Sequence, residues 1–493
     1  MKRLIILLTI FNWNFGFTQT SFISKYGENY TEAPTCIEQI GQNYYTGHMC
    51  SETESLKWSF AKISKLNSKG QLISEKAYPN ESGGYCNFER IHKLNDSEFL
   101  LIGAIKQANS PNAQIWVVKM DTTLNVIWDK KFMTNRPFTG NLTCTENSAG
   151  NIVIGLTLVT DSPQNYWSLF FLETTKEGDS IRSKSLTNGN PNFNIAESIL
   201  YMDGYYKVFV RGYHAYTNND CFTQVLHLDE NLNMTEVRPV PHSIDINMTA
   251  AKISSDEYYL TGNAYRTGLY LQVVITKFDT FENTLAYNEA GSPGNSVDYT
   301  AWKQCMAIAD SNSIYTGGTG NDNGNFYACH ENYMKAMMLS NYDSELNCRW
   351  TYFYGSDTAC YTMSTMDATS DGGCVMAGIY YDPSRPEKML DVIVIKVDRT
   401  GIITGTKGVQ DITSRNAIVF PNPGNDRVCI KSGPQIAGSR FVLHTISGQV
   451  VSTISLNGTD EQLSTKNLAP GVYPWSIIKD GKLIEQGKWI KQQ

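Results

Sequence analysis

The stretch that decides the fold runs from residue 98 to residue 133 and reads EFLLIGA, then QIWVVKMD, then LNVIWDKKFM. In its middle run, Ile115 and Val117 lie on one face of an extended chain, and Trp116 and Val118 lie on the other. An antiparallel strand with one solvated face alternates apolar and polar residues. Because both faces are apolar here, the run predicts a strand covered on both sides, as in a β-propeller blade between two neighbours.

The same three-run unit recurs along residues 36–410. A first apolar run ends in Gly, a second ends in Asp or Asn, and a third follows a turn; residues 371–408 repeat this as GGCVMAGIYY, DVIVIKVD and GIITGTKGV. The first-run glycines recur every 50 to 60 residues, at Gly47, Gly103, Gly155, Gly212, Gly262, Gly318 and Gly378. This period holds four short strands with loops. We expect an all-β chain with a seven-bladed β-propeller over residues 19–407; six or eight blades, a β-sandwich array or a β-solenoid are the alternatives.

Two residue types of this unit predict local features. The first-run glycine permits a bulge or a close backbone approach near the propeller axis. Asp or Asn at the end of the second run suits a tight turn between the third and fourth strands. These turn residues are Asn67, Asp121, Asp229, Asp279 and Asp398.

The units resemble the propeller-like repeats of secreted proteins from Bacteroidetes-type bacteria. The pattern of that family is roughly DGGYVLAG followed by a WLVKLD-like run and a tryptophan. Asp371–Gly378 and Asp391–Asp398 match it closely, and Ile115–Trp128 matches its second half. The resemblance implies a propeller body that works outside the cell.

Residues 1–18 have the pattern of a Sec signal peptide. A basic start at Lys2 and Arg3 precedes an apolar run at Leu4–Phe11, and the expected cut follows Thr18. A buried first strand is the alternative. The apolar run is far shorter than the ~20 residues that cross a bilayer, so no transmembrane span is expected.

Composition limits the partners. The chain is 41% apolar and 18% charged, with a net charge of −7; without the signal peptide and the basic C-terminal segment, the body carries about −12. An acidic body argues against a nucleic-acid partner. The 11 Cys fit an oxidising compartment. Cys36–Cys50, Cys329–Cys348 and Cys360–Cys374 are candidate disulfides, with buried free thiols as the alternative.

A polar linker at residues 408–416 precedes a second predicted domain at residues 417–493. Short alternating runs separated by turn residues predict a small β-sandwich there. Its expected strands are Arg427–Lys431, Ser439–Thr445, Val450–Leu456, Val472–Ile478 and Lys488–Ile490.

This segment is similar to the type A sorting domain of type IX secretion cargo. It opens on Phe-Pro-Asn-Pro, contains a strand pair around a turn glycine, continues with Leu-x-x-Gly-Val-Tyr and ends in a Lys-rich strand. The motif residues are Pro421, Asn422, Pro423, Gly448, Gly471, Tyr473, Lys488 and Lys491. Pro474 departs from the family pattern, which has another strand residue there. An immunoglobulin-like accessory module is the alternative.

The resemblance implies partners and a destination. The Sec translocon and the type IX secretion machinery would carry the protein through the periplasm to the outer-membrane surface or the medium. The sorting domain would then usually be cut off, and the body released or linked to surface lipopolysaccharide.

The sequence contains no complete catalytic or metal-binding motif, so we expect no metal site and no cofactor. His330-Glu331 begins an HExxH pattern, but Met334 occupies the position of the second ligand. Asn321–Asn325 lacks the alternating acidic ligands of a calcium loop and reads as a polar turn. Aromatic residues near inter-strand loops suit a sugar or protein site, or packing between blades. They are Tyr213, Tyr216, Tyr265, Tyr380 and Tyr381.

The leading hypothesis is a non-catalytic, secreted or surface-exposed propeller that binds a protein or glycan through loops on one face. The rival is a secreted glycan- or peptide-active enzyme, which would show inward-pointing Asp, Glu, His, Arg or Tyr at one mouth of the axial channel. A binder is expected to show a broad aromatic or polar loop surface without that cluster. A structural part of the export or adhesion machinery is the third hypothesis.

Overall fold

Every element in the described part of the chain is a β-strand, which confirms the predicted all-β class. No helix in that part is long and apolar enough to cross a membrane. The computed structural model describes residues 21–27, 30–52, 59–79, 84–108, 110, 112–134, 138–159, 167–186, 195–213, 221–241, 244, 246–266, 270–291, 297–320, 335–356, 359–384, 389–403, 417–422, 424–432, 436–445, 448–458, 460–479 and 481–492.

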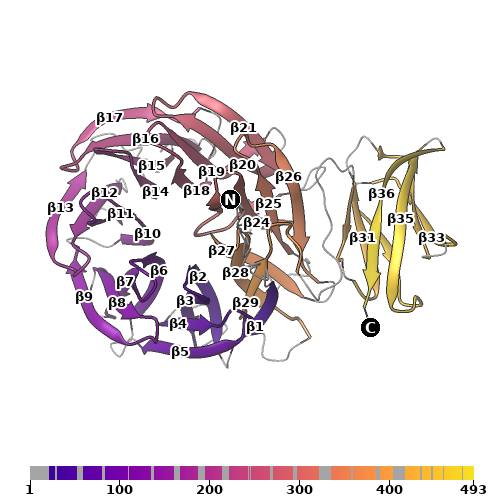
Figure 1. Cartoon of the computed structure of the whole chain (residues 1–493), viewed down its shortest axis with the longest axis horizontal. Helices are drawn as coiled ribbons and strands as arrows, with labels where there is room; N and C mark the ends of the chain where they lie inside the picture. The colour runs from indigo at the N-terminus through magenta and orange to yellow at the C-terminus, as the bar shows by residue number, and fades with distance from the viewer. Residues whose placement is uncertain are drawn as a thin grey trace, which may run out of the picture.

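Seven antiparallel sheets follow one another around a ring in the described residues between 22 and 397 (Figure 1). From the centre outward, the first sheet contains β2 (Thr31–Ile40), β3 (Asn43–Ser51), β4 (Phe60–Leu66) and β5 (Leu72–Pro79), and the second contains β6 (Tyr85–Lys93), β7 (Glu98–Lys106), β8 (Gln114–Asp121) and β9 (Val126–Met133). The third sheet contains β10 (Phe138–Glu146), β11 (Ile152–Val159), β12 (Trp167–Thr174) and β13 (Ser180–Leu186). The fourth sheet contains β14 (Ile195–Tyr201), β15 (Tyr205–Tyr213), β16 (Cys221–Asp229) and β17 (Met234–Pro239).

The other three sheets complete the ring. The fifth sheet contains β18 (Ile246–Lys252), β19 (Glu257–Arg266), β20 (Tyr270–Asp279) and β21 (Thr284–Ala290). In the sixth sheet, β22 (Tyr299–Thr300) and β23 (Met306–Asp310) both pair with β24 (Ser313–Gly320), which is followed by β25 (Ala336–Tyr342) and β26 (Cys348–Tyr354). The seventh sheet contains β27 (Cys360–Ala368), β28 (Cys374–Tyr381), β29 (Asp391–Val397) and β1 (Phe22–Tyr26). This arrangement confirms the predicted propeller class. The number of blades stays a prediction, which the seven sheets support.

Strand β8, whose sequence is apolar on both faces, is buried on both faces in the structure. In β8, Ile115 and Val117 pack into a core shared with β10, β11 and β12, whereas Trp116 and Val118 pack into a separate core with β3 and β4. All four side chains are buried. Each sheet is therefore held by apolar contacts with both neighbours, as the two-faced pattern predicted.

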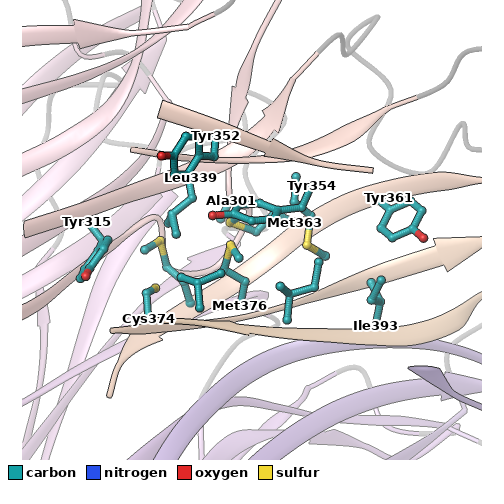
Figure 2. Close-up of a cluster of buried hydrophobic side chains, with 14 of the residues drawn as sticks. Ala301, Tyr315, Leu339, Tyr352, Tyr354, Tyr361, Met363, Cys374, Met376 and Ile393 are labelled. Carbon is teal, nitrogen blue, oxygen red and sulfur yellow. The ribbon is translucent and has the colours of Figure 1, made fainter. Parts of the chain in front are cut away.

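Figure 2 shows this packing between the sixth and seventh sheets. Leu339 and Tyr352, from β25 and β26, lie in one buried cluster with Met363 and Met376, from β27 and β28. Methionine is unbranched and flexible, so it fills irregular gaps between sheets that branched side chains leave open.

The ring is closed by the first described strand. β1 pairs antiparallel with β29, from Phe22 opposite Lys396 to Tyr26 opposite Val392, and so becomes the outermost strand of the last sheet. Tyr26 also reaches the first sheet, where its hydroxyl lies 2.7 Å from Thr46 Oγ1. The sequence repeat, which was recognised only from residue 36 onward, did not predict this closure.

A five-residue turn joins the third strand to the fourth, as the Asp and Asn residues predicted. Asp121 Oδ1 accepts hydrogen bonds from the backbone N–H of Thr123 at 2.8 Å and of Asn125 at 2.9 Å. The fourth turn residue, Leu124, has a φ of 66° and a buried side chain. The same left-handed position holds a buried residue in three other turns, at Leu232, Glu282 and Leu346.

Two of the candidate disulfides are wrong. Cys36 pairs with Gly47 in the β2–β3 ladder, whereas Cys50 pairs with Glu32. This separation of several strand residues is too long for a disulfide. Cys360 and Cys374 likewise lie at opposite ends of the β27–β28 ladder, and all four are buried free thiols. The third candidate pair includes Cys329, which lies outside the described residues.

The C-terminal segment forms two sheets, as a β-sandwich predicts. One has the order β30-β31-β34 and the other β33-β32-β35-β36. Four of the predicted strands are found with small shifts, the last strand begins six residues before its predicted start, and β30 and β34 were missed. The strands are β30 (Ala417–Phe420), β31 (Arg427–Ser432), β32 (Ser439–His444), β33 (Val450–Leu456), β34 (Asp460–Ser464), β35 (Gly471–Lys479) and β36 (Lys482–Lys491).

Candidate functional site

Six innermost strands carry a β-bulge or a similar register irregularity. The marker glycine of the second strand lies at this point: Gly103 pairs with Phe88, and a Cβ on Gly103 would lie 2.0 Å from the carbonyl oxygen of Asn87. The predicted bulge and close backbone approach are therefore confirmed at this glycine. The register shifts lie between Pro34/Cys36, Phe88/Arg90, Phe138/Leu142, Ala196/Ser198, Ile246/Thr249 and Met363/Thr365.

The bulges bring polar side chains to the axis of the ring. Glu89 and Glu197 are the extra residues of β6 and β14, and both line a narrow cavity. Asn141, from the shifted part of β10, and Lys303, between β22 and β23, line the same cavity. A bulge redirects a side chain that a regular strand would place elsewhere, which explains how β6, β10 and β14 contribute to one point; Lys303 reaches it from the segment between two strands.

The charged groups in this constriction form ion pairs. Lys303 Nζ contacts Glu89 Oε2 and lies 3.5 Å from Asn141 Oδ1, and Arg211 Nε lies 3.1 Å from Glu197 Oε1. Burial raises the pKa of Glu197, although nearby cations oppose the shift. Burial also lowers the pKa of Lys303, against the effect of Glu89.

A larger cavity of about 410 Å³ continues from the constriction along the axis. Its walls come from β6, β10, β14, β18, β23 and β27. Along β18 the lining runs from buried Met248 to exposed Lys252 at the strand end, so the cavity reaches the face of the turns that follow the innermost strands. Its size lies in the ~300–1,000 Å³ range of small-molecule sites.

The lining of this cavity is mostly polar and carries more basic than acidic residues. Arg90, His92, Lys252 and Lys303 face a single carboxylate, Asp367. Hydroxyl and amide side chains make up most of the remaining polar surface, from Thr143, Thr145, Ser198, Thr249 and Gln304. Such donors and acceptors can orient a polar ligand in a site that the strands have already formed.

Three of the four basic residues already have carboxylate partners, since Lys303 is paired with Glu89. Lys252 Nζ lies 2.6 Å from Asp203 Oδ1, and His92 Nε2 lies 3.1 Å from Glu146 Oε2. Burial lowers the pKa of His92 despite Glu146, so the imidazole is neutral at neutral pH. Among the described residues, Arg90 is therefore the basic residue of the lining without a paired carboxylate.

A pair of coupled carboxylates lies beside the cavity. Asp367, on β27, accepts a hydrogen bond from the backbone N–H of Gln39 at 3.3 Å, next to Glu38 on β2. Burial raises the pKa of Asp367 to about 6, and burial together with the charge of Asp367 raises the pKa of Glu38. The two carboxylates therefore hold a proton at a higher pH than isolated ones do.

Replacing Asp367 with asparagine is expected to stabilise the protein at pH values above about 6. A raised folded-state pKa means that the charged form is disfavoured in the folded chain, so native stability rises as pH falls through about 6. Asp367→Asn removes this charge and should raise the free energy of unfolding by about 1–2 kcal/mol at pH 8, with no gain near pH 4. Denaturant unfolding at both pH values measures this. Asp96→Asn, at an exposed position, is the control; an equal gain at both pH values would contradict the account.

The loop aromatics do not form a platform where they are described. Tyr381 is buried, and Tyr380 packs against Tyr361 with Lys25 Nζ 4.0 Å from its ring centre. These two tyrosines therefore pack within the fold. The side chains of Tyr213, Tyr216 and Tyr265 lie outside the described residues, as do Asn321–Asn325, His330 and Glu331. Within the described ranges, no three His, Cys, Asp or Glu side chains gather as metal ligands.

In the C-terminal segment, hydrogen bonds join the opening Phe-Pro-Asn-Pro motif to the last strand, β36. Asn422 Oδ1 accepts a hydrogen bond from the backbone N–H of Ile490 at 3.0 Å, and Trp489 Nε1 donates to the carbonyl oxygen of Pro421 at 2.7 Å. Tyr473 donates its hydroxyl to the carbonyl oxygen of Ala469 at 2.7 Å. The structure thus brings residues from both ends of the motif together. Pro423 lies outside the described residues.

The remaining motif residues differ in their surroundings. Lys491 is buried and donates to Asn425 Oδ1 at 2.8 Å, whereas Lys488 is exposed. Gly448 has a φ of 85° in the turn after β32. Gly471 begins β35 in an open position, where an added Cβ would meet only Tyr473 at 4.0 Å.

Pro474 keeps its strand pairing. It lies opposite Lys488 in the β35–β36 ladder, but beyond the residues of β35 that pair with β32. Its missing N–H therefore removes no hydrogen bond between β35 and β32. This position explains how the strand accommodates the departure from the family pattern.

Comparisons with solved structures show only a distant likeness. Polysaccharide lyase Uly1 has 10% identity and a TM-score of 0.44, over 73% of this chain and 89% of that one. The acylaminoacyl peptidase of Pyrococcus horikoshii has 12% identity and a TM-score of 0.43, over 84% and 58%. The subtype N10 neuraminidase-like protein of little yellow-shouldered bat has 10% identity and a TM-score of 0.36, over 61% and 90%. Likeness at this level carries no argument about activity.

The family comparison is specific to the end of the chain. No curated protein matches the sequence. Residues 418–492 match the secretion system C-terminal sorting domain, in agreement with the motif residues and with the two-sheet fold. The chain thus carries a C-terminal sorting domain, which implies handling by the type IX secretion machinery and a secreted or cell-surface location.

Proposed function

We propose that this chain is an exported protein whose propeller body acts outside the cell as a non-catalytic binding module for a protein or glycan, with the axial cavity as its binding site. The observation that carries the proposal is the polar cavity of about 410 Å³, which six innermost strands build at one end of the axis. The Sec signal peptide at residues 1–18, the passage through the periplasm and a Bacteroidetes-type source are part of the same proposal.

This proposal places the binding site in the channel, away from the loops favoured by the sequence. The cavity walls are strands with defined pairing, so their polar groups keep fixed positions before a ligand arrives. Of the aromatic candidates, Tyr380 and Tyr381 pack within the fold. An inward-pointing cluster of charged residues does exist, and this was the feature expected of an enzyme.

The pairing of that cluster favours binding over catalysis. A general acid or base must exchange its proton with the substrate. Glu89 is ion-paired with Lys303, and Glu197 is ion-paired with Arg211, in the narrow part of the channel. Moving a proton to either carboxylate would leave a buried cation without its partner, which is costly.

One observation favours the rival hypothesis of a secreted glycan- or peptide-active enzyme. Asp367 lines the cavity, and burial raises its pKa to about 6; burial and the charge of Asp367 also raise the pKa of the neighbouring Glu38. Carboxylates whose pKa values are raised towards neutral pH are suited to general acid catalysis. This pair would be the catalytic centre if the protein turns over a substrate.

The experiment that tests the proposal combines binding and turnover on one sample. Residues 19–493 are applied to a glycan array and to cell-surface extracts, and the same sample is screened for cleavage of polysaccharides and peptides. Selective binding without turnover is the expected result. Turnover that Asp367→Asn abolishes would replace the proposal with the enzyme hypothesis.

A further inference from the structure

The axial cavity holds one cation that has no carboxylate partner among the described residues. The body carries about −12, and of the basic residues that line the cavity, His92 is neutral, Lys252 pairs with Asp203 and Lys303 pairs with Glu89, which leaves Arg90. A concentration of positive charge in a low-dielectric channel attracts anions more strongly than the same charges on an open surface. Arg90 is thus the group in the cavity with which an anion would pair.

Arg90 has unused donors in this cavity. Its Nη1 donates to the backbone carbonyl of Glu89 at 3.0 Å, and among the described residues it forms no ion pair with a carboxylate. The side chain lines both the larger cavity and the constriction. A guanidinium has five N–H donors in a fixed plane, a geometry that matches a carboxylate.

Arg90 is the unpaired cation at the constriction. Lys303 is paired with Glu89 and Arg211 with Glu197, and among the described residues no carboxylate is paired with Arg90. Arg90 is half-buried, so an anionic group beside it would offset part of the cost of removing its charge from water.

From these observations we infer that the axial cavity binds the carboxylate of an acidic sugar, at the end of a glycan or free in solution. Arg90 binds the carboxylate, and Thr143, Thr145 and Ser198 hydrogen-bond the sugar hydroxyls. The polar lining favours a polyhydroxylated ligand, because a peptide end would offer apolar side chains to these hydroxyls. The inference rests on the proposed function and names the ligand class for the same cavity.

The test uses residues 19–493 and calorimetric titration with D-glucuronate, with D-glucose as the neutral probe. The native protein should bind glucuronate and not glucose, and Arg90→Gln should weaken glucuronate binding by about ten- to a hundred-fold, the effect of one charge-assisted hydrogen-bonded contact. Arg90→Lys should retain part of the affinity. Arg399→Gln, an exposed arginine on the outside of the channel, is the matched control and should bind as the native protein does.

A hexuronate oligosaccharide distinguishes the two sources of the acid. Tighter binding of the oligosaccharide than of glucuronate identifies a glycan end, and equal binding identifies the free sugar acid; both support the inference. Binding of glucose, glucuronate binding that survives Arg90→Gln, or capture of an acidic tetrapeptide in place of glucuronate would overturn it. If glycans on the array bind equally to native and Arg90→Gln protein, the inference fails while the proposed function stands.

Discussion

Replacing Glu282 with alanine is expected to lower the free energy of unfolding by about 3–5 kcal/mol, because it leaves a buried lysine without its counter-charge. Glu282 lies at the left-handed position of the turn between β20 and β21. Its carboxylate contacts Lys207 Nζ and lies 2.8 Å from Arg238 Nη1 and 3.3 Å from His227 Nε2. Denaturant unfolding measures the loss, and Glu230→Ala, at an exposed turn position, should cost less than about 0.5 kcal/mol.

The equivalent turns of three other sheets suggest a second variant, which tests whether the unpaired charge causes the loss of stability. Leu124, Leu232 and Leu346 occupy the position of Glu282 in three other turns, where each is buried between sheets. The double variant Lys207→Met with Glu282→Leu should therefore recover most of the stability, since an apolar pair often replaces a buried ion pair at no cost. A double variant as unstable as Glu282→Ala would show that lost packing, and not the unpaired charge, is responsible.

The same carboxylate sets a pH dependence. Burial alone would raise the pKa of Glu282, but hydrogen bonds from His227, Lys207 and Arg238 lower it to about 2. A depressed carboxylate pKa gives stability that is present above the unfolded-state value of about 4.3 and is lost as pH falls towards 2. The difference between native and Glu282→Ala protein should therefore shrink between pH 5 and pH 2.

Deleting residues 417–493 is expected to stop passage across the outer membrane almost completely. The sorting domain is the address read by the type IX machinery, so the body should accumulate in the periplasm instead of the medium or the cell surface. Fractionation and immunoblotting of the producing bacterium measure this. Normal export of the deleted chain would contradict the assignment of the domain.

The two motif lysines separate recognition from folding. Lys491→Gln removes a buried amine that donates to Asn425, so it should destabilise the sandwich by about 1–3 kcal/mol. Lys488 is exposed, so Lys488→Gln should leave the unfolding temperature of the domain unchanged. Reduced export of a stable Lys488→Gln protein would identify a contact with the machinery.

The repeat could be recognised in the sequence because three strands of each sheet share one pattern. Runs such as Ile115–Val118 are apolar on both faces, and Asp121-type turns recur at the same position, so class, period and turns could be predicted. Two features had no such signal. Closure through Phe22–Tyr26 depends on pairing with a strand more than 350 residues away. The candidate disulfides failed because sequence distance does not give position along a ladder.

The axial site was missed because innermost strands are the least regular part of each unit. Their polar residues differ from sheet to sheet, which hides the repeat. A signal was nevertheless present, since Glu89, Glu197 and Lys303 stand 14 or 15 residues before the marker glycines Gly103, Gly212 and Gly318. Charged residues at a constant offset from a structural glycine are what a repeated bulge would produce. Pairing, pKa shifts and cavity size need the fold itself.

The most direct test of the account is to fill the axial cavity and measure binding. Ala250 lines the cavity at the edge of an apolar core, so Ala250→Trp adds bulk at the cavity wall; Ser183→Trp, on an exposed outer strand, is the matched control. Both variants are compared with native protein for unfolding temperature and for binding to the ligand found on the glycan array or in surface extracts. The account predicts that a folded Ala250→Trp protein loses binding while Ser183→Trp retains it. Undiminished binding by the filled protein would show that the ligand does not enter the channel.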